Sequence, residues 1–201
     1  MARAQRKRRN VDTWKQKSWY EIVAPKSFNE AKIGETVTSD PENLKGRFVK
    51  ASMMDITGDF SKQHIKLEFK LGDVVGDKVQ TEFVGQYLSR DYMRSQIRRK
   101  STRVEDVVDV NTKDGHKIRV KSIAMAIGRA QATQEKAIRK IMRDIVIKRA
   151  QALDLEQFIN EVIKGRLSAN IYRGAGKIYS IKRVEIRKVR VLEDKKRSFE
   201  K

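Results

Sequence analysis

The sequence contains no cysteine, which excludes disulfide bonds, thiolate metal sites and a cysteine nucleophile. Histidine is almost as scarce, and neither His64 nor His116 has a second histidine at the spacing of a metal site. We therefore expect both to be surface residues, and we predict no cofactor, metal site or catalytic residue. With 2 prolines and no Ser- or Gly-rich spacer, the 201 residues show no obvious linker between domains.

Long apolar stretches are also missing. The basic N-terminal residues 1–9 are followed by polar residues, so we predict no signal peptide. No later run approaches the length of a membrane span. The lack of cysteine agrees with a cytoplasmic protein, which is the location we predict.

What the chain has in excess is positive charge. Lysine and arginine number 46 against 26 acidic residues, which gives a formal net charge of +20. Such a chain repels itself unless a polyanion neutralises it, and the most direct partner is nucleic acid. A basic membrane-surface protein would need a cationic amphipathic helix with aromatic anchors, of which the sequence shows no clear case. Hydrophobic residues make up 39%, enough for a folded core.

Charge also divides the chain along its length. Residues 1–17 carry seven basic residues against the single acid Asp12, with almost nothing to bury. We expect an RNA-binding arm that orders only on its partner. A single α+β domain is predicted for residues 18–192, followed by a charged tail at 193–201.

Alternation of apolar and polar residues predicts a mostly antiparallel, partly barrel-like sheet. The expected strands are 19–25, 49–53, 65–71, 79–87, 104–112, 117–125 and 184–192. A loop is predicted over 72–78, and Asp114-Gly115 suits a tight hairpin. Lys117, Arg119 and Lys121 should share one face of their strand. The last strand changes phase, which predicts a bulge near Lys188.

Helices are expected mainly in the C-terminal half. One exception is the segment 89–100, for which Ser89 is a plausible N-cap. An apolar stripe predicts a helix over 133–153, and Asp154 with Gln157 resembles the capping box of the next helix, which ends at Gly165. Beyond it Ile171, Ala175 and Ile178 keep helical spacing, but each interior glycine costs about 1 kcal/mol relative to alanine, which disfavours a helix there.

Two sequence patterns bear on nucleotide binding and on metal-dependent nuclease activity, and neither is sufficient evidence for that function. Gly174-Ala175-Gly176-Lys177 resembles a phosphate loop, but it lacks the earlier glycine and a serine or threonine after the lysine. Carboxylates that could hold a nuclease metal are Asp55 with Asp59, and Glu105 with Asp106 and Asp109. In so basic a chain we expect them to balance lysine and arginine instead.

Basic clusters short of acidic neighbours are the candidate RNA-binding sites. They are Arg6, Lys7, Arg8, Arg9, Lys15, Lys17, Arg94, Arg98, Arg99, Lys100, Arg103, Lys136, Arg139, Lys140 and Arg143. Trp14 joins this set because an exposed indole can stack on an unpaired base. Trp19 lies in a strand-like run, which predicts core packing.

Three segments together resemble a known family. They are Trp19-Tyr20-Glu21-Ile22-Val23-Ala24-Pro25, Phe28 with Ile33-Gly34-Glu35-Thr36, and Val184-Glu185-Ile186-Arg187-Lys188-Val189-Arg190-Val191-Leu192. They closely resemble the archaeal and eukaryotic ribosomal protein family S-three-A-e (S3Ae), and the elements between them follow the same order. The short length and the absence of a long C-terminal extension resemble the archaeal type. Where that family has a Lys- and Glu-rich helix before Ile-Tyr-Pro, this chain has Arg173 to Lys177 and then Ile178-Tyr179-Ser180.

The resemblance implies a structural protein of the small ribosomal subunit. It places the protein on the platform near the messenger exit side, where its partners would be small-subunit rRNA near the 3′ end, neighbouring platform proteins and mRNA. The alternative is a free single-stranded RNA-binding regulator, and a nuclease ranks third. Co-migration with small subunits after a salt wash would separate the first two.

Overall fold

The structure is a computed structural model that describes residues 14–192. Residues 1–13 of the predicted arm and the whole predicted tail lie outside this range. The chain forms two compact units, which we call the small unit (residues 14–49 and 70–82) and the large unit (residues 50–69 and 83–192). Within the described range, no helix is both long and apolar enough to cross a lipid bilayer.

The small unit is built on β1 (Ser18–Val23), β2 (Lys32–Thr38) and the adjoining ends of β4 (Ile65–Val75) and β5 (Lys78–Leu88). β1 is antiparallel to β2 and parallel to β5. Short 3₁₀ helices occupy Lys26–Phe28 and Pro41–Leu44. The core of this unit consists of Ile22, Leu44, Leu71 and Val79.

The large unit contains the remaining strands and all of the α-helices. Its elements are β3 (Phe48–Ser52, most of it), α1 (Met53–Thr57), the 3₁₀ helix Phe60–Lys62, α2 (Arg90–Gln96), β6 (Arg103–Asn111), β7 (Lys117–Ala126), α3 (Ala132–Ala152), α4 (Leu155–Ile163), α5 (Arg166–Ala175) and β8 (Ile181–Val191). Its sheet runs in the order β5-β8-β7-β6, with every neighbouring pair antiparallel.

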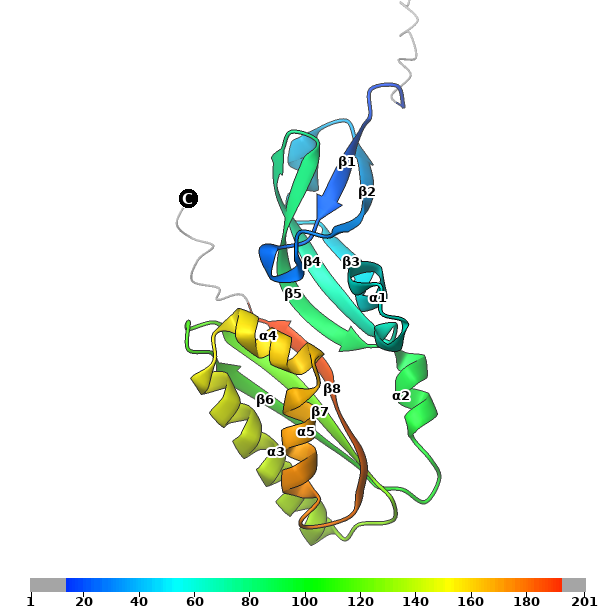
Figure 1. The fold of residues 1–201 in the computed structure, drawn as a ribbon, viewed down its shortest axis with the longest axis vertical. Coiled ribbons are helices and arrows are strands. Elements are labelled where there is room, and N and C mark those ends of the chain that lie inside the picture. The colour runs from blue at the N-terminus through cyan, green and yellow to red at the C-terminus, as the bar shows by residue number, and fades with distance from the viewer. Residues whose placement is uncertain (1–13, 193–201) are drawn as a thin grey trace, which may run out of the picture. The chain divides into compact units, whose positions relative to one another are not determined.

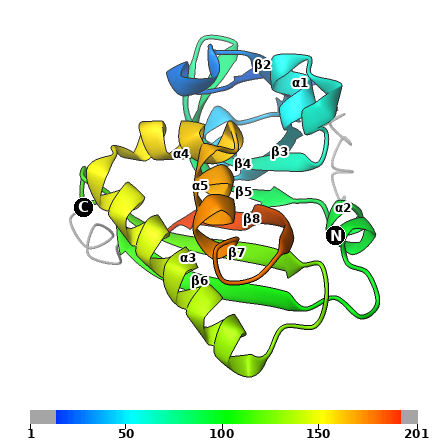
Figure 2. The same cartoon turned by 60° about the horizontal axis from the view of Figure 1, so that its bottom comes forward.

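The long helices cover one face of this sheet. Figures 1 and 2 show α3 and α5 lying across the same face of β6, β7 and β8. Alternation explains the arrangement: Val104, Val108 and Val120 point from the strands into a core with Met142 of α3 and Phe158 of α4. The opposite face carries Lys117, Arg119 and Lys121 of β7, although Ile123 and Met125 further along the same strand face are buried. Its basic part is the part available to a ligand.

The predicted fold class is confirmed. The eight strands form a mostly antiparallel sheet with the long helices in the C-terminal half, although the sheet does not close into a barrel. Ser89 caps α2 as predicted, since its hydroxyl accepts a hydrogen bond from the backbone N–H of Tyr92 at 3.3 Å. The predicted bulge lies beside Lys188, where the pairing of β8 with β7 skips one residue.

Several predicted boundaries are wrong. The 72–78 loop is mostly strand, because Gly76 with a φ of 62° lets β4 and β5 turn within two residues. Helix α2 ends at Gln96 rather than Lys100. The predicted capping box at Asp154 does not form, since the Asp154 side chain accepts no hydrogen bond from the first turn of α4; the Leu155 backbone N–H donates instead to the Asp114 carboxylate at 3.1 Å.

Helix α5 forms although its interior contains Gly174. A Cβ atom at this position would lie 3.0 Å from side-chain carbons of both Ile141 and Ile145 on α3. The missing side chain therefore lets α5 approach α3 closely, and burial of Ile171 and Ala175 offsets the poor helix propensity of glycine. The expectation of core packing for Trp19 is also wrong, since its side chain is 64% exposed on β1.

Candidate nucleic-acid interface

The open face of the large unit's sheet places like charges directly opposite each other. In one cross-strand row, Tyr87 of β5 faces Lys188 of β8, which faces Lys121 of β7. In the next row, Arg190 of β8 faces Arg119 of β7. Like charges at directly opposite positions destabilise a sheet, so this face contains repulsion that a bound polyanion would relieve.

The two rows differ in how their charge is balanced. Arg119 forms a bidentate ion pair with Asp109 of β6, at 2.6 and 2.7 Å, and this hydrogen bonding lowers the pKa of Asp109. Among the described residues, no carboxylate lies within ion-pair distance of Lys121 or Lys188. The uncompensated positive charge is therefore concentrated in the row that contains these two lysines.

The bulge in β8 adds a third cation to this face. β7 pairs Lys121 with Lys188 and Ser122 with Ile186, so Arg187 is the unpaired residue between them. In a regular strand, Arg187 and Lys188 would point to opposite faces of the sheet. The bulge instead brings both side chains to the same groove.

This groove is the main concave feature of the face. It has a volume of about 860 Å³ and is bounded by strands β3 to β8 and by helix α2. Its lining includes seven basic side chains and two carboxylates: Lys50, Arg90, Arg94, Arg103, Lys121, Arg187 and Lys188, with Glu68 and Glu105. The lining also contains Tyr87 and the apolar side chains Leu88, Met93 and Ile97. We call it the cationic groove.

Glu105 holds two of these arginines in position. Its Oε1 atom lies 3.3 Å from Arg103 Nε and 3.3 Å from Arg187 Nη1. Because one carboxylate cannot neutralise two guanidinium groups, a net positive charge remains beside it. Such a pair of fixed guanidinium groups suits the geometry of a phosphate.

A side-chain cluster fixes helix α2 at the edge of the groove. The ring of Tyr92 stacks on His64 with centroids 4.0 Å apart, and its hydroxyl donates to Glu185 at 3.1 Å. Arg183 bonds the same carboxylate at 2.8 Å. Burial and Glu185 raise the pKa of Tyr92 to about 12, while burial lowers the pKa of His64. The expectation that His64 is a plain surface residue is therefore wrong, whereas His116 is exposed as predicted.

The structure does not bring the predicted RNA-binding residues together in one site. Arg94 and Arg103 line the cationic groove. Arg98, Arg99 and Lys100 lie exposed in the segment between α2 and β6, and Trp14, Lys15 and Lys17 lie in an exposed turn before β1. Arg6, Lys7, Arg8 and Arg9 lie outside the described residues.

Helix α3 carries the last predicted cluster. Lys136 and Lys140 are exposed, but two of its arginines bond within the chain. Arg139 pairs with Glu135 at 3.2 Å, and Arg143 pairs with Asp106 of β6 at 2.9 Å. A contact between these four residues and RNA stays a prediction.

Sequence reasoning missed five cations of the groove: Lys50, Arg90, Lys121, Arg187 and Lys188. Two signals pointed toward them. The alternation of Lys117, Arg119 and Lys121 marked one strand face, and the phase change near Lys188 marked the bulge. Neither signal could say which strands are neighbours.

The pair formed by Arg143 and Asp106 leads to a stability prediction. The Asp106 side chain is only 6% exposed, so removing its partner leaves a buried charge without compensation. We expect Arg143→Met to lower the melting temperature by several degrees, as measured by circular dichroism. Lys140→Met on the same helix is the matched control, and it should leave the melting temperature nearly unchanged. Equal melting of the two variants would contradict a structural role for this pair.

The carboxylates considered for a nuclease are mostly engaged with basic residues, as predicted. Asp59 pairs with Lys62 at 3.3 Å, and Asp106 and Asp109 pair with arginines as described above. Asp55 has a different role, since it accepts the backbone N–H of Ser52 at 3.0 Å and caps α1. Within residues 14–192, no group of three or more potential ligands is placed to hold a metal ion.

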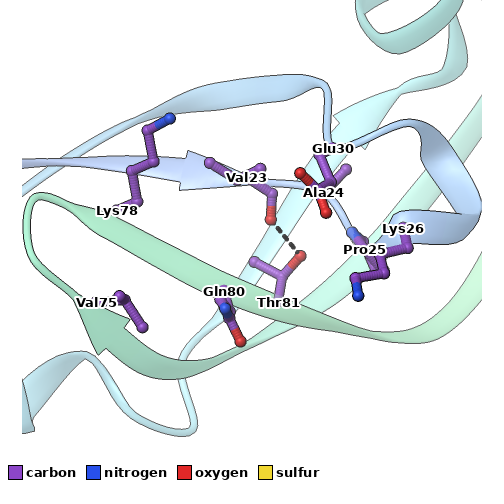
Figure 3. A pocket seen from close by; sticks show the side chains of 9 residues that line it. All are labelled: Val23, Ala24, Pro25, Lys26, Glu30, Val75, Lys78, Gln80 and Thr81. Carbon is purple, nitrogen blue, oxygen red and sulfur yellow. Dashed lines mark hydrogen bonds between the residues drawn. The ribbon is translucent and has the colours of Figure 1, made fainter.

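A second, smaller pocket of about 400 Å³ lies in the small unit (Figure 3). Its nine lining residues include Lys26, Lys78 and Glu30, so its charge is mixed. The Thr81 hydroxyl donates to the carbonyl oxygen of Val23 at 2.8 Å and ties β5 to β1 beneath it. The cationic groove is therefore the better candidate for binding a polyanion.

Comparison with known proteins shows the family of this chain. The model of the ribosomal S3Ae family matches residues 5–195. A protein named small ribosomal subunit protein eS1 from Methanothrix thermoacetophila is 43% identical over 189 residues, which cover 94% of this chain and 90% of that protein. The protein of the same name from Sulfolobus acidocaldarius is 46% identical, with coverage of 90% and 93%. The one from Methanothermobacter thermautotrophicus is 44% identical, with coverage of 96% and 99%. The chain therefore belongs to the ribosomal S3Ae family.

Proposed function

We propose that this protein is a structural constituent of the small ribosomal subunit in the cytoplasm, and that it binds rRNA through the cationic groove. The names of its relatives support the assignment to the small subunit. The observation that carries the RNA-binding part is the pairing of Lys121 with Lys188, two cations directly opposite each other with no carboxylate partner among the described residues. A fold maintains such repulsion at a cost to its stability, and RNA phosphates compensate for it.

The groove residues bind and orient RNA and carry out no reaction. Lysines and arginines neutralise phosphates, which supplies most of the affinity, and Glu105 keeps Arg103 and Arg187 in position for that contact. We further propose that the protein occupies the platform, close to the 3′ end of the rRNA, neighbouring platform proteins and mRNA on the exit side. The family resemblance is the support for this placement.

Sedimentation tests the assignment. In a cell extract washed with moderate salt, the protein is expected to co-migrate with small subunits. A protein that instead stays at the top of the gradient would favour the alternative of a free single-stranded RNA-binding regulator.

The predicted arm gives a prediction that separates binding from folding. Deleting residues 1–17 should weaken RNA binding and assembly, because the arm contributes seven basic residues. The melting temperature of the remaining chain should stay nearly unchanged, since the described residues of the arm, 14–17, are all exposed. Melting curves and filter binding measure the two effects. A truncated chain that melts much earlier would show that the arm is part of the folded structure.

A further inference from the structure

One side chain in the cationic groove does not fit a surface that binds phosphate alone. Glu68 of β4 lines the groove and is half-buried. Across residues 14–192, neither an ion pair nor a side-chain hydrogen bond involves its carboxylate. Glu105, the other groove carboxylate, differs because two arginines neutralise it.

A carboxylate is a poor neighbour for a phosphate, since both are anions. When RNA fills the groove, Glu68 loses water, and a half-buried acceptor that gains no donor in exchange weakens binding. Phosphates and sugar-ring oxygens are acceptors only, and the ribose 2′-OH offers a single donor. Two adjacent donors that can bond both oxygens of a carboxylate are found on the edges of the bases.

Two adjacent donors of one base are accessible together only when that base is unpaired. In an A-form duplex the Watson–Crick edges are occupied and the deep groove excludes side chains. The groove also presents Tyr87, whose ring lies 5.9 Å from Lys50 Nζ and offers an aromatic surface to a base. A volume of about 860 Å³ is within the range of about 300–1,000 Å³ typical of sites for ligands as large as a nucleotide.

We propose that Glu68 makes the cationic groove a site for single-stranded RNA with an unpaired guanine. This inference rests on the proposed function, because it assumes that the groove binds RNA. A carboxylate has two acceptor oxygens, and guanine presents two adjacent donors, N1–H and the N2 amino group, that match them. Adenine and cytosine place an acceptor beside their amino group, and uracil flanks its N–H with two carbonyl oxygens, which a carboxylate repels.

Binding of short RNA probes to the full chain tests this assignment. The probes are an oligouridine, the same strand with one central guanosine, and the same strand with inosine, which lacks the N2 amino group. Fluorescence anisotropy at physiological salt should show the guanosine probe binding about tenfold more tightly than oligouridine, the discrimination expected of one bidentate contact. The inosine probe should bind with intermediate affinity, and a duplex should show no benefit from guanosine.

The variant Glu68→Gln should lose the preference for guanosine while binding oligouridine at least as tightly, because a negative charge has been removed. Glu156→Gln is the matched control: it makes the same change at an exposed position on α4, outside the groove lining, and should keep the preference. Equal binding of all probes by the wild-type chain, or loss of the preference in both variants, overturns the role of Glu68. Absence of salt-dependent binding to every probe would instead overturn the proposed function itself.

Discussion

Replacing both Lys121 and Lys188 by glutamine is expected to weaken RNA binding about twentyfold at physiological salt. Each phosphate contact contributes a slope of roughly 0.7–0.9 to the fall of log affinity with log salt, which corresponds to roughly fivefold per contact between 1 M and 0.15 M salt. Loss of both contacts should therefore also reduce the measured slope by about 1.4–1.8. Filter binding across a salt series measures both quantities.

The same double variant should not melt earlier than the wild-type chain. Its two side chains lie directly opposite each other on β7 and β8, so their neutral replacements remove a repulsion. The matched control is Lys148→Gln with Lys164→Gln, which removes two charges outside the groove lining, one at an exposed position of α3 and one at the exposed residue that follows α4. If this control weakens binding as much as the groove variant, the affinity depends on net charge alone and the cationic groove is not the binding site.

Gly85→Ala is expected to be the most destabilising single-methyl change in the sheet. A Cβ atom at this position would lie 2.5 Å from the carbonyl oxygen of Val189 and 3.3 Å from the Cα atom of Arg190. Because the clash is with backbone, β5 must move away from β8. Overpacking of this kind costs roughly 1–3 kcal/mol or more. At about 2–4 °C per kcal/mol, the melting temperature should fall by roughly 2–12 °C.

This change should also reduce RNA affinity. Gly85 belongs to the short stretch where β5 pairs with β8, two residues before the pairing of Tyr87 with Lys188. Gly34→Ala in β2 is the control, since no atom outside its immediate neighbours lies within 4 Å of its added Cβ and its φ is not positive. The free energy of unfolding of that variant should stay within about 0.5 kcal/mol of the wild-type value. Similar melting temperatures of the two alanine variants would show that the pairing of β5 with β8 does not depend on the absence of a side chain at Gly85.

The sequence was most informative where local rules act alone. Period-two alternation placed β4, β6 and β7, because side chains on successive residues of a strand point to opposite faces. Ser89 was identified as an N-cap from its position before a helical segment. The phase change near Lys188 indicated the bulge, since only an inserted residue reconciles the two halves of that strand.

Predictions failed where a tertiary contact overrides a local preference. Helix α5 forms through Gly174 because that glycine packs against Ile141 and Ile145 of α3. Asp154 makes no cap hydrogen bond to α4, and the first backbone N–H of that helix donates to Asp114, which is distant in sequence. Trp19 is exposed even though its strand-like pattern resembles a core segment.

By itself, the sequence determined that the net positive charge of this protein is high enough to require a polyanion. It also determined that Lys117, Arg119 and Lys121 share one face of their strand. Only the tertiary structure decided which basic side chains meet. Lys121 and Lys188 become neighbours through the register of β7 with β8, and Arg187 joins them because the bulge turns it to the same groove. The physical reason is that side-chain direction depends on local backbone geometry, whereas strand order and register depend on how the whole core packs.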